Sequence, residues 1–246
     1  MNQIKISDSE IEEGGVYYIA NSLQGLVEEF GGNTVIEKKA DRIIAKIYCK
    51  PTYLDLFRSE IEDKVADVLA IKYKYEFFKR KICPMGLNAY QSEILYTALI
   101  SADIEDDKRY IIRRIRGLDG YVLDGIYTQL LPPLKNKWQE IVSYIPLFFD
   151  GNKLCDFVSF LVSEKRGKRV IVEGTKVYDG NYNRLKRSLL LDGEGDVLRE
   201  VLLSASGNVD VLSTLPEETV RYLKSFFGGR ITFLKGSLQK TVDKNF

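Results

Sequence analysis

Residues 52–83 read TYLDLFRSEIEDKVADVLAIKYKYEFFKRKIC, and this stretch predicts one long helix at the centre of the fold. Thr52 and Asp55 have the spacing of a helix-capping pair, and Pro84 follows directly after the stretch. Apolar residues recur every seven positions, at Leu54, Ile61, Val68, Tyr75 and Ile82. Such a row is typical either of a coiled-coil seam for a partner chain or of one helix that covers the core of its own chain.

The companion row, three residues further on, separates these two interpretations. Lys64 interrupts that row, and the neighbouring Val65 indicates that the apolar stripe drifts around the helix, which favours the core of the chain itself. If the protein binds another protein or a second copy of itself, residues 52–83 are nevertheless the contact that the sequence predicts.

Residues 1–50, before this helix, predict a small α/β unit. A short strand over residues 2–6 leads to a helix whose capping pair is Ser7 and Glu10 and which ends at two glycines, Gly31 and Gly32. Two β-branched runs then predict a hairpin that extends to residue 48.

The chain after the long helix is helical up to residue 166 and rich in strands from residue 167 on. RVIVEG and KVYD predict a hairpin, and the helix that begins near Thr214 and Glu217 stands between a strand at 209–212 and the final RITFL. This strand, helix, strand order is typical of a crossover connection. We therefore predict an α+β fold with an N-terminal α/β unit (1–50), a mostly helical central body (51–166) and a C-terminal mixed-sheet unit with a crossover helix (167–246).

The chain of 246 residues contains no histidine, which excludes several classes of chemistry. A Ser-His-Asp or Cys-His mechanism and the usual histidine-containing zinc sites cannot be built. Lysine and arginine (36) nearly balance aspartate and glutamate (35), so no global field attracts the chain to nucleic acid or anionic lipid. Any site for a polyanion must therefore be a local patch.

Cysteine usage and the start of the chain predict a cytoplasmic protein. Cys49, Cys83 and Cys155 are odd in number and widely spaced, which does not make a disulfide framework or a metal motif. The polar start MNQIKISDSEIEE lacks the basic and apolar regions of a signal peptide, and no apolar run is long enough to span a bilayer.

The sequence predicts neither a metal site nor a cofactor. Asp192, Glu194 and Asp196 alternate like the carboxylates of a calcium loop, but Val197 and Leu203 stand where an EF-hand needs glycine and glutamate. A solvated acidic turn is the preferred interpretation. Nucleotide binding has no support either, because no complete glycine-rich phosphate motif is present.

The candidate binding residues are Arg109, Arg113 and Arg116. Their spacing of four and three places all three guanidinium groups on one side of a helix, where they could hold phosphates. The alternative is a surface neutralised by three nearby acids, Glu105, Asp106 and Asp107. The basic turn 165–169 leaves the same choice between a polyanion site and plain surface.

Two stretches carry a family resemblance. LDGYVLDGIYTQLLPPLKNKWQEIVSYI (118–145) and LCDFVSFLVSEK (154–165) resemble the central helices of the YtxC-like sporulation protein family. RVIVEGTKVYDGNYNRL and STLPEETVRYLKSFFGGRITF look like the hairpin, penultimate helix and final strand of that family. The resemblance covers roughly residues 85–235. The phenylalanine and arginine usual after the glycine of the family's central helix are replaced here by Tyr121, Val122, Leu123 and Asp124.

The resemblance implies a cytoplasmic protein of endospore-forming bacteria, connected with sporulation, whose biochemical activity is not established; it carries over no site residues. We accordingly expect a non-enzymatic role in protein interaction. Two alternatives stay open: binding of nucleic acid or phosphate through the three arginines, and a histidine-free enzyme that uses carboxylates. The enzyme would need a pocket with two converging Asp or Glu side chains of perturbed pKa.

Overall fold

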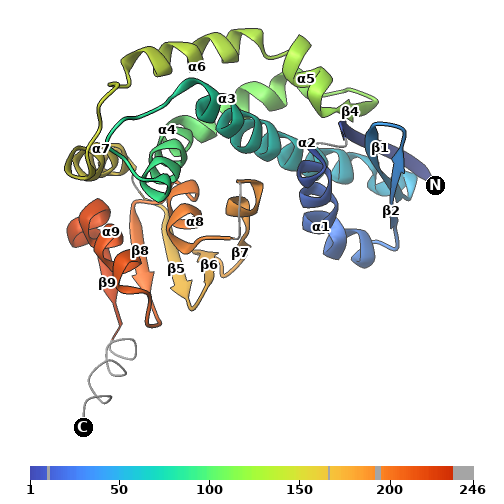
Figure 1. Cartoon of the computed structure of the whole chain (residues 1–246). Coiled ribbons are helices and arrows are strands. Elements are labelled where there is room, and N and C mark those ends of the chain that lie inside the picture. Colours follow the sequence, from blue (N-terminus) through green and yellow to red (C-terminus); the bar gives the residue numbers. More distant parts are fainter. Residues whose placement is uncertain (10–11, 166, 192–194, 235–246) are drawn as a thin grey trace. The chain divides into compact units, whose positions relative to one another are not determined.

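The computed structural model describes residues 1–9, 12–165, 167–191 and 195–234 (Figure 1). These residues form an α+β fold, as predicted, divided into two compact units. Unit 1 comprises Met1–Phe78 and Glu105–Tyr144, and unit 2 comprises Lys79–Ile104 and the described part of Ile145–Phe246. The predicted helical body (51–166) is thus divided between the units, because helices α3 (Lys74–Lys81) and α4 (Ala89–Ile115) each continue from one unit into the other.

Unit 1 contains a four-stranded sheet in the order β2-β3-β1-β4. Its strands are β1 (Asn2–Ser9), β2 (Asn33–Lys39), β3 (Arg42–Cys49) and β4 (Gly120–Val122). The predicted hairpin is confirmed, since β2 and β3 pair antiparallel. β1 pairs antiparallel with β3 and parallel with β4, which brings the segment after α4 to the first strand of the chain.

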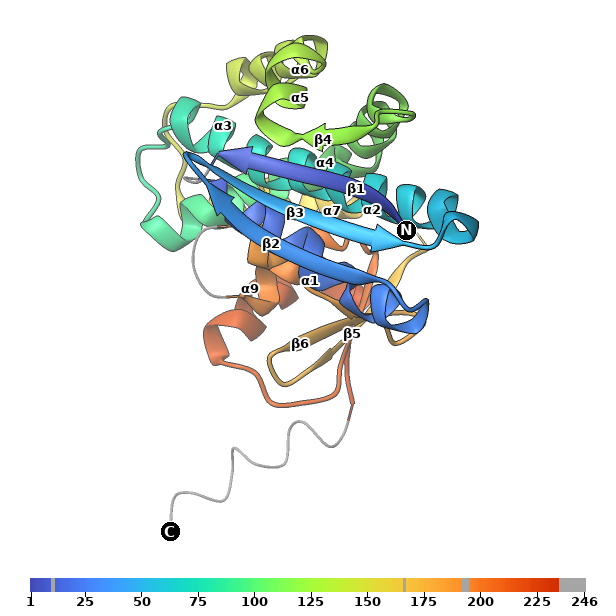
Figure 2. The ribbon, with the colours of Figure 1, turned by 90° about the vertical axis from the view of Figure 1, so that its right-hand side faces the viewer.

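Helix α1 (Gly14–Glu29) covers one face of this sheet (Figure 2). Alternate residues of β1 and β3, including Ile4, Ile6 and Ile47, are buried, as the pleat of half-buried strands requires. The capping pair predicted for this helix is wrong at Ser7, which lies inside β1, and its other member, Glu10, lies outside the described residues.

The long helix of residues 52–83 consists of α2 (Leu54–Val68), a π-helical turn (Leu69–Tyr73) and α3. Thr52 lies in a 3₁₀ turn (Pro51–Tyr53) before α2, so it is not the predicted helix cap. Four of the five heptad positions are buried: Ile61, Val68, Tyr75 and Ile82. Leu54, the fifth position, is half-buried. The row therefore lies mainly in the core, as the interpretation of one helix covering its own chain predicts, and the contact with a partner chain stays a prediction.

Three further helices complete unit 1. The second half of α4 follows a bend at Asp103, whose φ of −132° is not helical. Helices α5 (Leu123–Gln129) and α6 (Pro132–Tyr144) follow β4, and Trp138 of α6 is fully buried.

Unit 2 contains a five-stranded sheet in the order β7-β6-β5-β8-β9. The strands are β5 (Arg169–Glu173), β6 (Lys176–Asp179), β7 (Arg184–Leu185), β8 (Asn208–Val211) and β9 (Ile231–Phe233). The predicted hairpin is β5–β6, and the predicted crossover is β8, α9 (Glu217–Phe227) and β9, because β8 and β9 pair parallel.

The helices of unit 2 include α7 (Gly151–Ser163) and α8 (Val197–Leu203) besides the first half of α4. Helix α9 contacts α7 and buries Leu223, Phe226 and Phe227. Helix α9 begins at Glu217, directly after Pro216. Within the described residues, no helix has the length and apolar character needed to cross a membrane.

Candidate functional site

Of the three predicted arginines, Arg109 and Arg113 lie on the second half of α4 and Arg116 directly follows its last residue, all in unit 1. Arg109, Arg113 and Arg116 are all exposed, and together with Asp106 and Ile112 they line a surface hollow of about 600 Å³. The structure therefore brings the three residues to one side of one helix, as their spacing predicted. This row is called the arginine face below.

The acids predicted to neutralise this face are used unequally. Asp106 pairs with Arg109, and both side chains remain largely in solvent. Arg113 instead donates its Nε–H to the carbonyl oxygen of Arg109, at 3.2 Å. Asp107 lies on the opposite side of α4 and is fully buried, so its charge does not reach the arginine face. The predicted neutralisation is thus observed where Asp106 pairs with Arg109, whereas Asp107 takes no part in it.

Asp107 is the centre of a buried polar cluster that the sequence did not reveal. Lys74 of α3 donates to its Oδ2 at 2.7 Å, the indole N–H of Trp138 donates to the same oxygen at 2.9 Å, and Lys137 donates to Oδ1 at 2.8 Å. The Lys74 ammonium also lies 5.6 Å from the ring centroids of Phe78 and Trp138. These contacts fix the rotation of α4 and thereby keep the arginine face outward.

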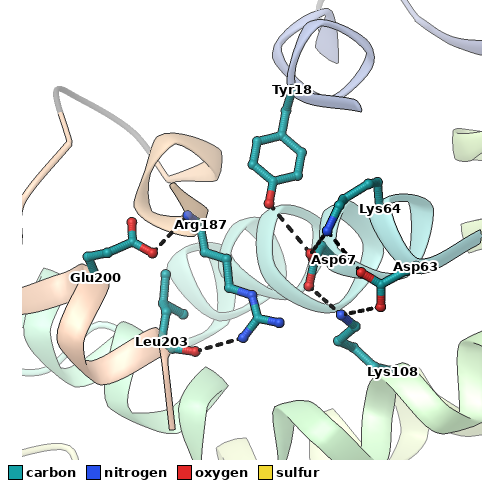
Figure 3. Close-up of polar contacts among 8 residues, drawn as sticks. All are labelled: Tyr18, Asp63, Lys64, Asp67, Lys108, Arg187, Glu200 and Leu203. Atoms are coloured by element: carbon teal, nitrogen blue, oxygen red, sulfur yellow. Dashed lines mark hydrogen bonds and ion pairs between the residues drawn. The ribbon is translucent and has the colours of Figure 1, made fainter. Parts of the chain in front are cut away.

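A second cluster ties helices α1, α2 and α4 together inside unit 1 (Figure 3). The Lys108 ammonium lies 2.8 Å from a carboxylate oxygen of Asp63 and 2.8 Å from one of Asp67, and Tyr18 donates to Asp67 at 3.5 Å. Burial opposes ionisation of Asp63, but the charges and hydrogen bonds of Lys108 and Lys64 outweigh it and lower the pKa of Asp63 to about 2. This carboxyl therefore stays ionised and acts as a structural anion.

Asp8, at the end of β1, is the one carboxyl of unit 1 whose pKa the structure raises strongly among the residues described. Burial raises the pKa of this fully buried side chain to about 6, although a 2.7 Å hydrogen bond from the Tyr73 hydroxyl opposes the shift. Its Oδ2 has no hydrogen-bond partner. Nearby, Arg42 donates two hydrogen bonds to Asp124, at 2.7 and 3.1 Å, and these lower the pKa of Asp124.

Asp8 and Asp124 thus have pKa values displaced in opposite directions, which is one property that acid–base chemistry needs. The other property is access to a substrate. Asp8 has no exposed surface, and its one described side-chain partner is the tyrosine that covers it. The arrangement is that of a buried structural carboxyl, not of an open catalytic pair.

Unit 2 has a hollow of about 310 Å³ between β6, β7 and α8, and its carboxylates have structural roles. Glu200 accepts the backbone N–H groups of Arg187 and Ser188 at 2.9 and 2.7 Å, and Arg187 donates to the carbonyl oxygen of Leu203 (Figure 3). Asp196 caps α8 by accepting the N–H of Arg199.

The two remaining sequence candidates are partly outside the described residues. Asp192 and Glu194 of the calcium-like loop lie outside them, whereas Asp196 serves as the cap of α8. In the basic turn, Arg166 lies outside them, Lys165 donates to the carbonyl of Ala102 and Arg169 pairs with Asp210. Over the part of the chain that the structure describes, no group of three or more Cys, Asp or Glu side chains is placed to hold a metal ion.

Comparison with known proteins adds no relative: no family model matches the chain, and no similar curated protein or solved structure was found. The resemblance to the YtxC-like family therefore stays a prediction. The function has to be argued from the surfaces and clusters of this chain.

Proposed function

We propose that this protein is a non-enzymatic binding protein, cytoplasmic and connected with sporulation, that recognises a polyanionic partner through the arginine face. The sporulation connection rests on the resemblance of residues 118–145 and 154–165 to the YtxC-like family. The binding role rests on the structure of α4.

The observation that carries the binding role is the opposite use of charge on the two sides of α4. On one side, Asp107 is fully buried and bonded to two lysines and a tryptophan. On the other, Arg113 and Arg116 are exposed, and Asp106 pairs with Arg109. The guanidinium N–H groups of an exposed arginine suit bidentate binding of phosphate or carboxylate.

A non-enzymatic role is supported by the fate of the carboxylates. The histidine-free enzyme would need two acids converging in an accessible pocket, whereas Asp8 is fully buried and Glu200 holds two backbone N–H groups. Nucleic acid and acidic protein segments are both polyanions, and a row of exposed guanidinium groups attracts either through its positive charge. Binding to nucleic acid is tested first.

The test compares retention on immobilised DNA for the full chain and for a variant with Arg109, Arg113 and Arg116 all changed to Ala. If all three contact phosphates, the slope of log affinity against log salt concentration should fall by about 3, that is about 0.9 for each lost contact. The matched control changes three exposed arginines elsewhere, Arg169, Arg184 and Arg221, and removes the same charge from unit 2. If the salt dependence of retention has the same slope in both triple variants, the arginine face does not contribute specifically to DNA binding.

The sporulation connection has a separate test. Deletion of the gene in its own organism, followed by counts of heat-resistant spores, should lower the spore yield while vegetative growth stays normal. An unchanged yield would leave the binding proposal standing and remove the sporulation part.

A further inference from the structure

Two short segments of unit 2, each beginning with a proline, lie side by side and hold apolar side chains out into solvent. Residues 84–86 read Pro-Met-Gly and residues 146–148 read Pro-Leu-Phe. Met85 and Phe148 form a parallel β-bridge, in which Met85 N–H donates to the Leu147 carbonyl at 2.8 Å and Phe149 N–H donates to the Met85 carbonyl at 2.9 Å.

Three apolar side chains at this bridge are exposed: Met85 by 59%, Leu147 by 77% and Phe148 by 53%. They are called the apolar tip below. Single exposed apolar residues are ordinary on protein surfaces, but here three of them gather at one bridge between segments distant in sequence. The adjacent Phe149 is buried and anchors the second segment.

Gly86 is required by this construction. Its φ is +95°, and a Cβ atom there would lie 2.8 Å from the Phe149 carbonyl oxygen and 3.0 Å from the Phe148 ring. The close approach of the two segments thus depends on a glycine. The apolar tip is therefore held in place by backbone hydrogen bonds and is not a frayed loop.

One exposed lysine lies against the apolar tip, and three exposed cations precede it in sequence. The Lys153 ammonium lies 5.3 Å from the Phe148 ring centroid, and the exposed residues Lys79, Arg80 and Lys81 end four positions before Met85. The nearest acid in sequence, Asp150, is occupied as the cap of α7, where it accepts the Lys153 backbone N–H at 2.9 Å. Residues 79–86 and 146–153 together carry four basic side chains and one acidic side chain, although the whole chain carries only +1.

From this arrangement we infer that the apolar tip is a peripheral membrane-binding surface for anionic lipid bilayers. Leu147 and Phe148 would enter the boundary between headgroups and acyl chains, and Lys81 and Lys153 would lie among the lipid phosphates. The side chains project outward, which suits insertion into a fluid layer. The backbone groups at the bridge already bond to one another, so they need no water on insertion.

Sedimentation of the full chain with lipid vesicles tests this inference. The protein should bind vesicles of phosphatidylcholine mixed with anionic phosphatidylglycerol and bind vesicles of phosphatidylcholine alone much more weakly. Changing both Leu147 and Phe148 to Ser should lower the affinity by about tenfold or more, and Lys81→Gln and Lys153→Gln should each lower it about fivefold. The matched control is Leu189→Ser, because Leu189 is also more than half exposed but belongs to a 3₁₀ turn of unit 2 and to neither of the two bridged segments.

Two outcomes would overturn the inference. The first is absence of binding to anionic vesicles, or equal binding by the Leu147/Phe148 and Leu189 variants. The second is a wild-type dimer that becomes monomeric when Leu147 and Phe148 are changed, since the apolar tip would then be a contact between copies of the chain. In the Arg109, Arg113 and Arg116 triple variant, changing Leu147 and Phe148 to Ser should still lower vesicle binding about tenfold, whereas the proposed function is tested on DNA, so the two can fail independently.

Discussion

Unit 1 and unit 2 use buried charge in different ways. In unit 1, charged side chains from different helices meet one another, as Lys74 and Asp107 do at 2.7 Å and Lys108 and Asp67 do at 2.8 Å. In unit 2, the shortest contacts of such side chains are with the main chain: Glu200 accepts two backbone N–H groups at 2.9 and 2.7 Å, and Arg230 donates to the Val162 carbonyl at 2.9 Å. The ion pair between Arg199 of α8 and Glu93 of α4 is longer, at 3.7 Å.

The difference follows from the elements that each cluster joins. The clusters of unit 1 connect α2, α3, α4 and α6, whose own backbone groups are satisfied inside the helices, so only side chains are left to pair. The cluster at Glu200 supports a short 3₁₀ turn (Arg187–Leu190), whose N–H groups have few partners of their own. Buried charge therefore orients helices in unit 1, whereas at Glu200 in unit 2 it completes backbone hydrogen bonding.

The largest effect is expected when the Asp107 cluster is broken. Asp107→Ala should lower the free energy of unfolding by about 3–5 kcal/mol, because the fully buried Lys74 loses the carboxylate that neutralises it. Urea unfolding followed by the fluorescence of Trp138, the single tryptophan, measures this directly. The control, Lys74→Met combined with Asp107→Leu, removes both charges and should recover much of the loss. If Asp107→Ala lowers the free energy of unfolding by less than about 1 kcal/mol, the Lys74–Asp107 ion pair contributes no more than an exposed surface pair does.

Asp8 gives unit 1 an expected dependence on pH. Its pKa rises from the ordinary 3.8 to about 6 in the folded chain, so the proton is held more tightly by the folded state. The stabilisation is complete below pH 4 and is lost as the pH rises towards 6, a change of roughly 3 kcal/mol for a shift of about two units. Asp8→Asn should remove this dependence and be the more stable protein at pH 7. If the free energy of unfolding depends on pH in the same way in the wild type and in Asp8→Asn, the raised pKa does not belong to Asp8.

A smaller effect is expected from the main-chain bonding in unit 2. Glu200→Ala leaves the N–H groups of Arg187 and Ser188 without their acceptor, and hydrogen bonds to a charged group contribute about 1.5–3 kcal/mol. Hydrogen exchange should show faster exchange of those two amides. The control Glu218→Ala removes an exposed glutamate of the same unit, paired only at 3.4 Å with Arg221, and should leave exchange at residues 187 and 188 unchanged.

The local sequence pattern predicted which helices and strands form better than it predicted the residues at which they begin and end. The hairpins, the crossover connection β8–α9–β9 and the helical character of residues 52–83 follow from apolar periodicity, which is a property of neighbouring residues. The predicted capping residues Ser7 and Thr52 were wrong, because β1 extends through Ser9 and a 3₁₀ turn precedes α2. The end of an element depends on which segment it meets, and spacing alone does not contain that information.

The sequence by itself determined that the chain cannot use histidine chemistry, that it forms an α+β fold, and that Arg109, Arg113 and Arg116 share one side of a helix. Only the tertiary structure decided that the neighbouring Asp107 faces inward, because its partners Lys74 and Trp138 are 33 and 31 residues away along the chain. It likewise decided that Met85 lies beside Phe148 and that the heptad row of residues 52–83 is buried core. Helical spacing fixes which side chains share a face, whereas what that face meets depends on contacts between segments far apart in sequence.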